Sequence, residues 1–407
     1  MVSNEGLWRW IVLSSYCFIT AASQMIWLEF SGIAVPQMVL IFHVNLLMIG
    51  LMVSIWPLLS IPLAPISGIF ADRFGYKFTI TLGGSIITFF SWLRLLAGKD
   101  FTLLLIFQSL AGVGQTFIYN SVTKLVSEWF PQHEQAVANG IGTMSEIAGM
   151  ALALIISPLL TPSSSYSYLF INMITYSSIA TVSLIAFVLI INRARAPQNY
   201  SGASISLNNV IGILRIRSII ILMIITFIGT GIFASLTQWI EPILYLRDVP
   251  QIYSDLAGMV MLISGSIGMV ALPYISDRIR TRKKLFIINT AILSALLLLF
   301  SIRLPNPILY FTLLIPTGFF LLSLAPLALQ LSLDIVGPTR IGTATGLLGL
   351  MAEAGAFLMI VIIGEIYDIT KNLFSSNQWF AAILTLSVLS LVISLLSLTI
   401  KETITSA

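Results

Sequence analysis

Residues 68–77 of the chain read GIFADRFGYK and separate two long apolar runs. The stretch carries Asp72 and Arg73, then Gly75 and Lys77, immediately before the second run begins. Glycine adopts the backbone conformations that tight turns require, and charged side chains can pair with one another or cap a neighbouring helix end. The stretch therefore predicts a short charged turn between two consecutive helices.

The rest of the chain is as apolar as the flanks of this turn. Of its 407 residues, 57% are hydrophobic and 9% are charged, and the mean hydropathy is +1.00. About a quarter of the residues of a soluble domain are charged, so this chain cannot cover a water-facing surface. We expect an integral membrane protein with the lipid bilayer as a partner. The net charge of +4 favours anionic lipid, and nothing indicates nucleic acid.

Residues that carry enzyme chemistry are scarce. The chain has one cysteine, Cys17, and two histidines, and it contains no HExxH, CxxC or nucleophile-elbow pattern. A single cysteine cannot form an internal disulfide or a cysteine-based metal site. We therefore expect no enzyme activity, no metal and no cofactor.

Twelve apolar runs are long enough to cross a bilayer. A spanning helix needs about 20 mostly apolar residues, and open strands cannot satisfy their backbone in lipid. We expect an all-α membrane protein with twelve transmembrane helices, near residues 8–32, 44–70, 77–96, 101–124, 135–159, 166–191, 217–246, 254–276, 284–302, 307–332, 341–366 and 378–400. The longest polar connection follows the sixth run, which predicts an N-terminal half at 1–192, a linker at 193–216 and a C-terminal half at 217–407.

The two predicted halves share three sequence patterns at matching places. Repeats of this kind are typical of transporters, which hold their substrate near the bilayer midplane between the repeats. We therefore expect two pseudo-symmetric six-helix bundles. The matching segments are GIFADRFGYK and PYISDRIRTRKK (273–284, with Asp277 and Arg278), Trp27-Leu28-Glu29 and Trp239-Ile240-Glu241, and ANGIGTMSEIAG (138–149) and ATGLLGLMAEAG (344–355).

Basic residues divide unevenly between the connections. If both termini are cytoplasmic, fifteen of the twenty lysines and arginines lie on the cytoplasmic side. Cytoplasmic connections carry an excess of lysine and arginine. We therefore predict a multi-pass protein of the cell membrane with both termini and the linker in the cytoplasm.

The pattern Gly68-x-x-x-Asp72-Arg73-x-Gly75-x-Lys77 resembles the loop signature of the major facilitator superfamily. This resemblance implies the fold of that superfamily over the whole chain and secondary transport by alternating access. It also implies a conformational role for the signature and for its counterpart in the second half. The residues concerned are Asp72, Arg73, Gly75, Asp277 and Arg278.

A narrower set of residues resembles the transporters related to the feline leukaemia virus subgroup C receptor. The set comprises Gly114-Gln115-Thr116-Phe117, Lys124, Trp129-Phe130-Pro131, Pro326 to Gln330 and Thr345-Gly346-Leu347-Leu348. That family is associated with choline and ethanolamine import and with haem export. The resemblance implies that Gln115 lines the substrate site and that Glu353 replaces a second glutamine of the family. The family's cage tryptophan falls at Met25 and its seventh-span tyrosine at Ala234, so an aromatic cage for quaternary ammonium is not preserved.

Two glutamates occupy the same point of the repeated segments, inside the membrane. At 1.5 Å per residue, Glu146 lies about 16 Å into the fifth span and Glu353 about 18 Å into the eleventh. A carboxylate near the midplane costs at least ~2.5–3.5 kcal/mol, so each must face the bundle interior, a partner or a watery cavity. Both are candidates to bind a cation or carry protons; alternatively, each bonds a neighbouring helix.

Other polar and aromatic residues complete the candidate site. Gln115 and Tyr119 share one face of the fourth span at a spacing of four residues. Trp27 and Trp239 are candidates for substrate contact, although a tryptophan near the interface is usually an anchor. Glu29 and Glu241 are candidates for an outer gate, and no lysine or arginine falls mid-span.

These patterns favour a secondary transporter, by symport or antiport, for a small organic cation or amine. The partners expected are this small molecule and protons, and a monomer is expected. One alternative is a multidrug/proton antiporter for lipophilic cations. Another is a non-transporting receptor or sensor on the same scaffold, against which stands the lack of any long soluble segment in the sequence.

The predicted topology can be tested by labelling. In a Cys17→Ser background, Ser201→Cys is expected to resist a membrane-impermeant thiol reagent added to intact cells, because the linker is placed inside. The same position should react after the cells are opened. Ready labelling from outside would reverse the orientation.

Overall fold

The computed structural model describes residues 4–31, 33, 35–194, 212–279, 282–337 and 341–400. Within these ranges the regular structure is helical. Twelve segments are long and apolar enough to cross a membrane, which confirms the predicted all-α fold. They are Leu7–Leu28, Leu46–Ala71, Arg73–Ala97, Phe101–Trp129, Val137–Leu160, Tyr166–Arg193, Arg217–Tyr245, Leu256–Ser276, Arg282–Ser301, Ile308–Val336, Thr343–Thr370 and Phe380–Leu398.

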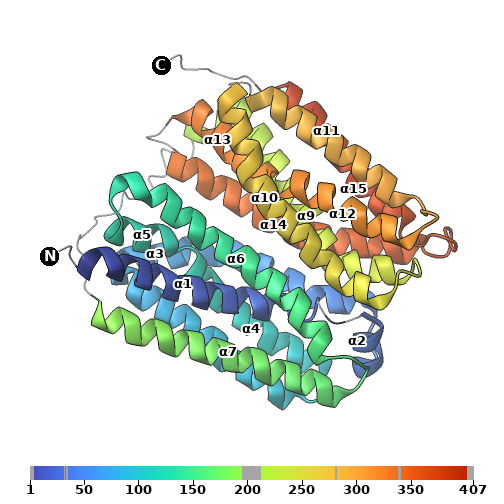
Figure 1. Cartoon of the computed structure of the whole chain (residues 1–407), viewed down its shortest axis with the longest axis horizontal. Helices are drawn as coiled ribbons and strands as arrows, with labels where there is room; N and C mark the ends of the chain where they lie inside the picture. The colour runs from blue at the N-terminus through green and yellow to red at the C-terminus, as the bar shows by residue number, and fades with distance from the viewer. Residues whose placement is uncertain are drawn as a thin grey trace. The chain divides into compact units, whose positions relative to one another are not determined.

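Residues 1–203 form one compact unit, coloured from blue to green in Figure 1. We call this unit the first bundle. Its elements are α1 (Asn4–Leu28), α2 (Val35–Phe42), α3 (Leu46–Leu93), the 3-10 helix η1 (Arg94–Ala97), α4 (Phe101–Tyr119), α5 (Val122–Trp129), α6 (Gln132–Leu160) and α7 (Tyr166–Arg193).

Residues 204–407 form a second compact unit, coloured from yellow-green to red in Figure 1. We call it the second bundle. Its helices are α9 (Arg217–Tyr245), α10 (Gln251–Ile279), α11 (Arg282–Ser301), α12 (Pro307–Leu322), α13 (Leu324–Val336), α14 (Ile341–Thr370) and α15 (Phe380–Leu398). Most of the predicted linker lies outside the described residues, so its boundaries stay a prediction.

The signature turn divides α3 at Gly75. This residue has φ 79° and ψ 161°, a conformation that costs little only for glycine. Neither arginine of the repeated Asp-Arg pairs has an ion pair among the described residues: the guanidinium of Arg73 lies 5.4 Å from the ring centroid of Phe74, and that of Arg278 lies 4.9 Å from the ring of Tyr274. The side chains of Asp72 and Asp277 lie outside the described residues, so the conformational role of the pairs stays a prediction.

Lys77, the last residue of the signature stretch, caps a neighbouring helix. Its Nζ donates to the carbonyl oxygens of Ile191 at 3.4 Å and Ala194 at 3.1 Å, at the end of α7. Lysine favours this position because the last carbonyls of a helix lack partners and carry partial negative charge.

The second bundle repeats this cap 206 positions later. Lys283 donates to the carbonyl oxygens of Leu398 at 2.8 Å and Ile400 at 2.6 Å, at the end of α15. In each bundle a lysine at the start of the third span therefore binds the end of the sixth.

Two spans are broken where the sequence predicted continuous helices. α4 gives way to α5 after Tyr119, and α12 gives way to α13 at Ser323. Beside each break an asparagine bonds a serine of another span. Asn120 Nδ2 donates to Ser67 Oγ at 2.7 Å, and Asn289 Nδ2 donates to Ser323 Oγ at 3.0 Å. Such side-chain partners allow irregular backbone inside a membrane.

Glycines set the closest helix contacts in both bundles. A Cβ atom at Gly149 of α6 would collide with the carbonyl oxygen of Ala21 in α1. A Cβ atom at Gly355 of α14 would collide with that of Phe227 in α9. Small residues let helices approach closely in lipid. These contacts fix the rotation of α6 and α14, and hence the direction in which their glutamates point.

The lysine caps can be tested by replacing Lys77 or Lys283 with methionine, which keeps the stem but removes the charge and the donors. Each change is expected to reduce the free energy of unfolding by about 1 kcal/mol, the upper end of the usual range for a cation near an exposed helix C-terminus. Thermal unfolding in detergent measures this as a lower midpoint. Lys284→Met is the matched control, because Lys284 is exposed; an equal loss in the control would contradict the assignment.

Candidate substrate site

Glu353 is the acidic candidate for which the described residues provide no partner. It lies twelve residues after the start of α14, about 18 Å along the helix axis, which is near the middle of a hydrocarbon layer about 30 Å thick. The side chain is partly exposed. Among the described residues it makes no hydrogen bond or ion pair. A carboxyl group at this depth is therefore available to a ligand or a proton.

Glu146 has a different environment. It is buried in α6, with an exposure of 7%, and it makes a polar or electrostatic contact within the protein. Gly142 and Gly149 lie four residues before it and three after it, so the three share one face of the helix. Gly142 packs against Tyr16, and Gly149 against Ala21. Glu146 therefore lies beside the contact between α6 and α1.

Glu146 and Glu353 do not occupy equivalent positions when α6 and α14 are aligned on the glycines that contact a neighbouring helix, Gly149 and Gly355. Gly149 precedes Gly355 by 206 positions, whereas Glu146 precedes Glu353 by 207. One residue corresponds to a rotation of about 100° in an α-helix. Glu146 thus lies about 60° from the face of its glycine and Glu353 about 160° from its own. The sequence analysis expected both acids at the same point of the repeat. They are in fact one residue apart when the two segments are aligned on their glycines.

Gln115 lies on α4 between two residues that pack inward. Gly114 is in close contact with Gly83 of α3, and Thr116 Oγ1 hydrogen-bonds Ser60 Oγ at 2.9 Å. Gln115 itself is partly exposed, and its amide makes no hydrogen bond among the described residues. Tyr119, one turn later, is 46% exposed and has an interaction within the protein.

The repeated tryptophans bind neighbouring helices. The indole N–H of Trp27 donates to the carbonyl of Val53 at 3.0 Å, and that of Trp239 donates to the carbonyl of Ile360 at 3.1 Å. Trp239 is fully buried, with its ring centroid 5.8 Å from that of Trp379. Substrate contact by either tryptophan stays a prediction, and the geometry assigns both a packing role.

Glu29 belongs to a buried polar network that the sequence did not reveal. Arg94 Nη1 lies 2.8 Å from Glu29 Oε2, and both side chains are fully buried. The same nitrogen donates to Gln108 Oε1 at 2.8 Å, and Gln108 Nε2 donates to the carbonyl of Ile26 at 3.1 Å. The network joins α1, η1 and α4 within the first bundle. The sequence signal was a lone arginine and a lone glutamine in apolar runs.

The second bundle also has a buried arginine, Arg247, but its partners differ from those of Arg94. Arg247, just beyond α9, donates to the carbonyl oxygens of Phe300 at 2.6 Å and Ser301 at 3.2 Å, and to Asn377 Oδ1 at 3.2 Å. Burial lowers the pKa of Arg247 to about 10, so the guanidinium stays charged at neutral pH. Glu241 is buried and has a partner within the protein.

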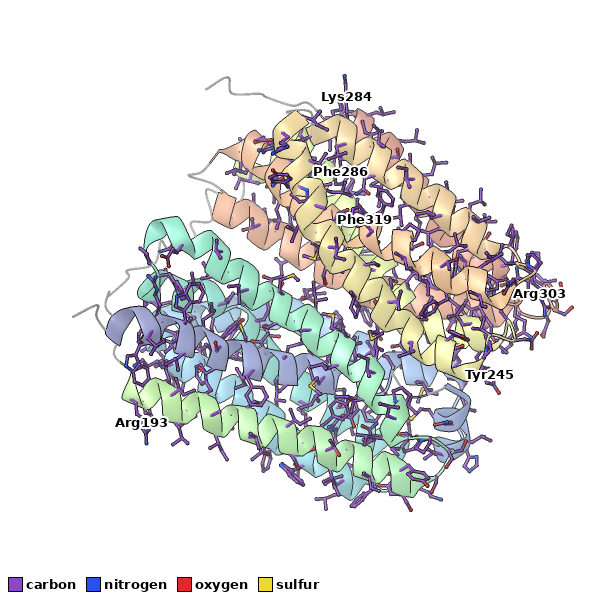
Figure 2. All side chains as sticks on the ribbon, viewed as in Figure 1. Arg193, Tyr245, Lys284, Phe286, Arg303 and Phe319 are labelled. Atoms are coloured by element: carbon purple, nitrogen blue, oxygen red, sulfur yellow. The ribbon has the colours of Figure 1, made fainter. Side chains whose placement is uncertain are left out.

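An exposed ion pair lies at the same end of the second bundle. Arg303 Nη2 is 2.8 Å from Asp248 Oδ2, and Figure 2 shows Arg303 at the opposite end of the bundle from Lys284. The gating roles predicted for Glu29 and Glu241 stay predictions.

Twelve spans in two bundles, with polar side chains at mid-span that have no protein partner among the described residues, are typical of a membrane transporter. The family model of the Major Facilitator Superfamily matches residues 12–360. The chain belongs to this superfamily, whose members are secondary transporters and not enzymes.

The chain is similar to several transporters and solute carriers of known name. Solute carrier family 49 member A3 of Xenopus tropicalis is 24% identical over 383 residues, which cover 87% of this chain and 77% of the relative. Choline/ethanolamine transporter FLVCR2 of Homo sapiens is 22% identical over 387 residues, covering 88% and 72%. A bacterial homologue of the human lysosomal transporter Spinster, solved in an inward-facing and occupied conformation, matches with a TM-score of 0.76 at 14% identity over 96% of each chain. These matches confirm both resemblances seen in the sequence.

The buried network predicts a large coupling between Glu29 and Arg94. Removing one partner of a buried ion pair costs about 3–5 kcal/mol, because the other charge is left uncompensated. Glu29→Met and Arg94→Met are each expected to lower the thermal unfolding midpoint strongly, whereas the double variant should recover most of the loss. If the two losses simply add, the side chains do not act as a pair.

Proposed function

We propose that this transporter moves a small organic cation or amine and that Glu353 supplies the negative charge that meets it. The observation that supports this most is the carboxyl group of Glu353, which is partly exposed and has no partner among the described residues. Ionisable residues within spans usually mark substrate or ion pathways. A cation would supply the missing partner.

The composition of the spans supports a cationic substrate. Lysines and arginines within the twelve spans lie near span ends. Arg94, whose side chain is fully buried, is paired with Glu29. An anionic substrate would be expected to meet a cation within the membrane, since arginine and lysine bind carboxylate and phosphate strongly.

Gln115 is proposed as a neutral substrate-binding group of the first bundle. Its amide offers both a donor and an acceptor and lacks a partner among the described residues. Glu146, Tyr119, Trp27 and Trp239 are proposed as secondary contributors, because each already has a contact within the protein.

The named relatives, and the absence of aromatic side chains at positions 25 and 234 of this chain, narrow the substrate class that we propose. FLVCR2 is a choline/ethanolamine transporter. Here Met25 and Ala234 stand where that family has its cage aromatics, and both are buried. A quaternary ammonium depends on aromatic faces, whereas a primary amine can donate hydrogen bonds to the carboxylate of Glu353. We therefore propose an ethanolamine-like primary amine as the preferred substrate.

The second candidate is a proton-coupled antiporter for lipophilic cations. The carboxyl group of Glu353, which has no partner among the described residues, also favours an antiporter. An acid without a fixed counter-ion can gain and lose a proton during the transport cycle. The two candidates differ in whether Glu353 binds the substrate or the proton.

Glu353→Gln separates these functions, because glutamine keeps shape and hydrogen bonding but removes the charge. Charge-assisted contacts contribute about 1.5–3 kcal/mol, so amine binding is expected to weaken about ten- to a hundredfold. Binding is measured by thermal shift after a screen of amines, lipophilic drugs and anions, and transport by uptake into proteoliposomes.

Two matched variants complete the experiment. Glu365→Gln removes the same charge from an exposed position twelve residues later in α14, and should bind amine like the parent. Glu146→Gln shows whether the buried acid contributes. Normal binding but lost pH-driven accumulation in Glu353→Gln would favour the antiporter. Unchanged binding and accumulation in both Glu353→Gln and Glu146→Gln would overturn the proposal.

A further inference from the structure

A groove lies between α1 and α7 within the first bundle. It has a volume of about 340 Å³ and is lined by Trp10, Ile11, Ser14, Ser15, Phe18, Ala186 and Ile190. This volume lies within the range of small-molecule sites. Trp10 is 36% exposed and Phe18 is 40% exposed. Both helices are membrane spans, so an opening with these apolar walls faces lipid chains.

One polar group in the groove lacks a partner. Serine in a helix commonly bonds the carbonyl three or four residues earlier, as Ser15 does with Val12 at 2.7 Å. Ser14 is exposed and makes no such bond among the described residues. A hydroxyl at a lipid-facing position therefore remains available to the ester or headgroup region of an amphipathic ligand.

Positive charge gathers where the groove reaches the end of α7. Arg193 lies three residues beyond Ile190, so the two share a face of the helix. It is exposed and has no ion pair among the described residues. Lys77 lies beside it, bonded to the carbonyl of Ala194. Arg9, at the other wall, already pairs with Glu134 at 3.0 Å.

We propose that this groove binds one anionic phospholipid, with an acyl chain between α1 and α7 and the phosphate at Arg193. Basic pockets between spans are known to hold anionic headgroups, and the apolar walls suit a hydrocarbon chain. The charge at the groove end selects the headgroup. Neither the site nor its test depends on the amine proposed above.

The test is native mass spectrometry of the purified full chain with phosphatidylglycerol and phosphatidylcholine of identical acyl chains. The parent is expected to retain one phosphatidylglycerol in preference to phosphatidylcholine. Arg193→Gln should weaken phosphatidylglycerol binding about fivefold, the effect of one basic residue at a lipid surface, and leave phosphatidylcholine unchanged. Lys284→Gln is the matched control, because it removes one exposed charge from the second bundle. Figure 2 labels both Arg193 and Lys284.

The apolar part of the groove is tested by filling it. Ser14→Phe should lower the retention of both lipids, whereas Ile185→Phe, which adds an aromatic ring at an exposed position outside the groove, should not. If Ser14→Phe does not fold, photo-crosslinking of an acyl-labelled lipid to the parent decides, with α1 and α7 peptides expected. Equal effects of Arg193→Gln and Lys284→Gln, unchanged retention in Ser14→Phe, or crosslinks spread evenly over the spans would overturn the proposal.

Discussion

Two close backbone contacts, Gly149 against Ala21 and Gly355 against Phe227, determine what the rest of each bundle can do. Because no side chain separates these helices, their rotation is fixed by contact between backbones. Every other residue of α6 and α14 then points in a set direction. The one-residue difference between the two acids places Glu146 beside α1 and turns Glu353 away from α9. A rotation of about 100° per residue thus separates a buried, partnered acid from an available one.

Much of the fold could be predicted from the sequence, because the ability to span a membrane depends on local composition. Twelve apolar runs gave the twelve spans, and the repeated segments predicted two related bundles. The short helix α2 and the breaks after Tyr119 and at Ser323 were missed. Each break depends on a partner from a distant part of the chain, such as Ser67 for Asn120. No local pattern encodes such a pairing.

The candidate site was predictable only in part, because contacts between distant parts of the chain are not encoded in a local sequence pattern. Glu353 and Gln115 stand out in a sequence as polar residues within apolar runs, and neither has a partner in the part of the chain that the structure describes. The sequence could not show that Trp239 is enclosed by its own bundle. Nor could it show that Glu29 meets Arg94, 65 positions away, with Gln108 as a third member. Those outcomes depend on helix rotation and on which spans become neighbours.

The two bundles share a scaffold but differ in how they neutralise charge. In the first bundle the buried arginine is compensated by Glu29; in the second, backbone carbonyls and Asn377 surround Arg247. A charge satisfied inside its own bundle can move with that bundle as a rigid body, without exchanging partners during the transport cycle. Glu353 has no such internal partner among the described residues. Because an uncompensated charge in the membrane is costly, its free energy falls when a cation or a proton arrives. Binding then changes the conformational equilibrium only to the extent that this gain in free energy differs between the two conformations of the transporter.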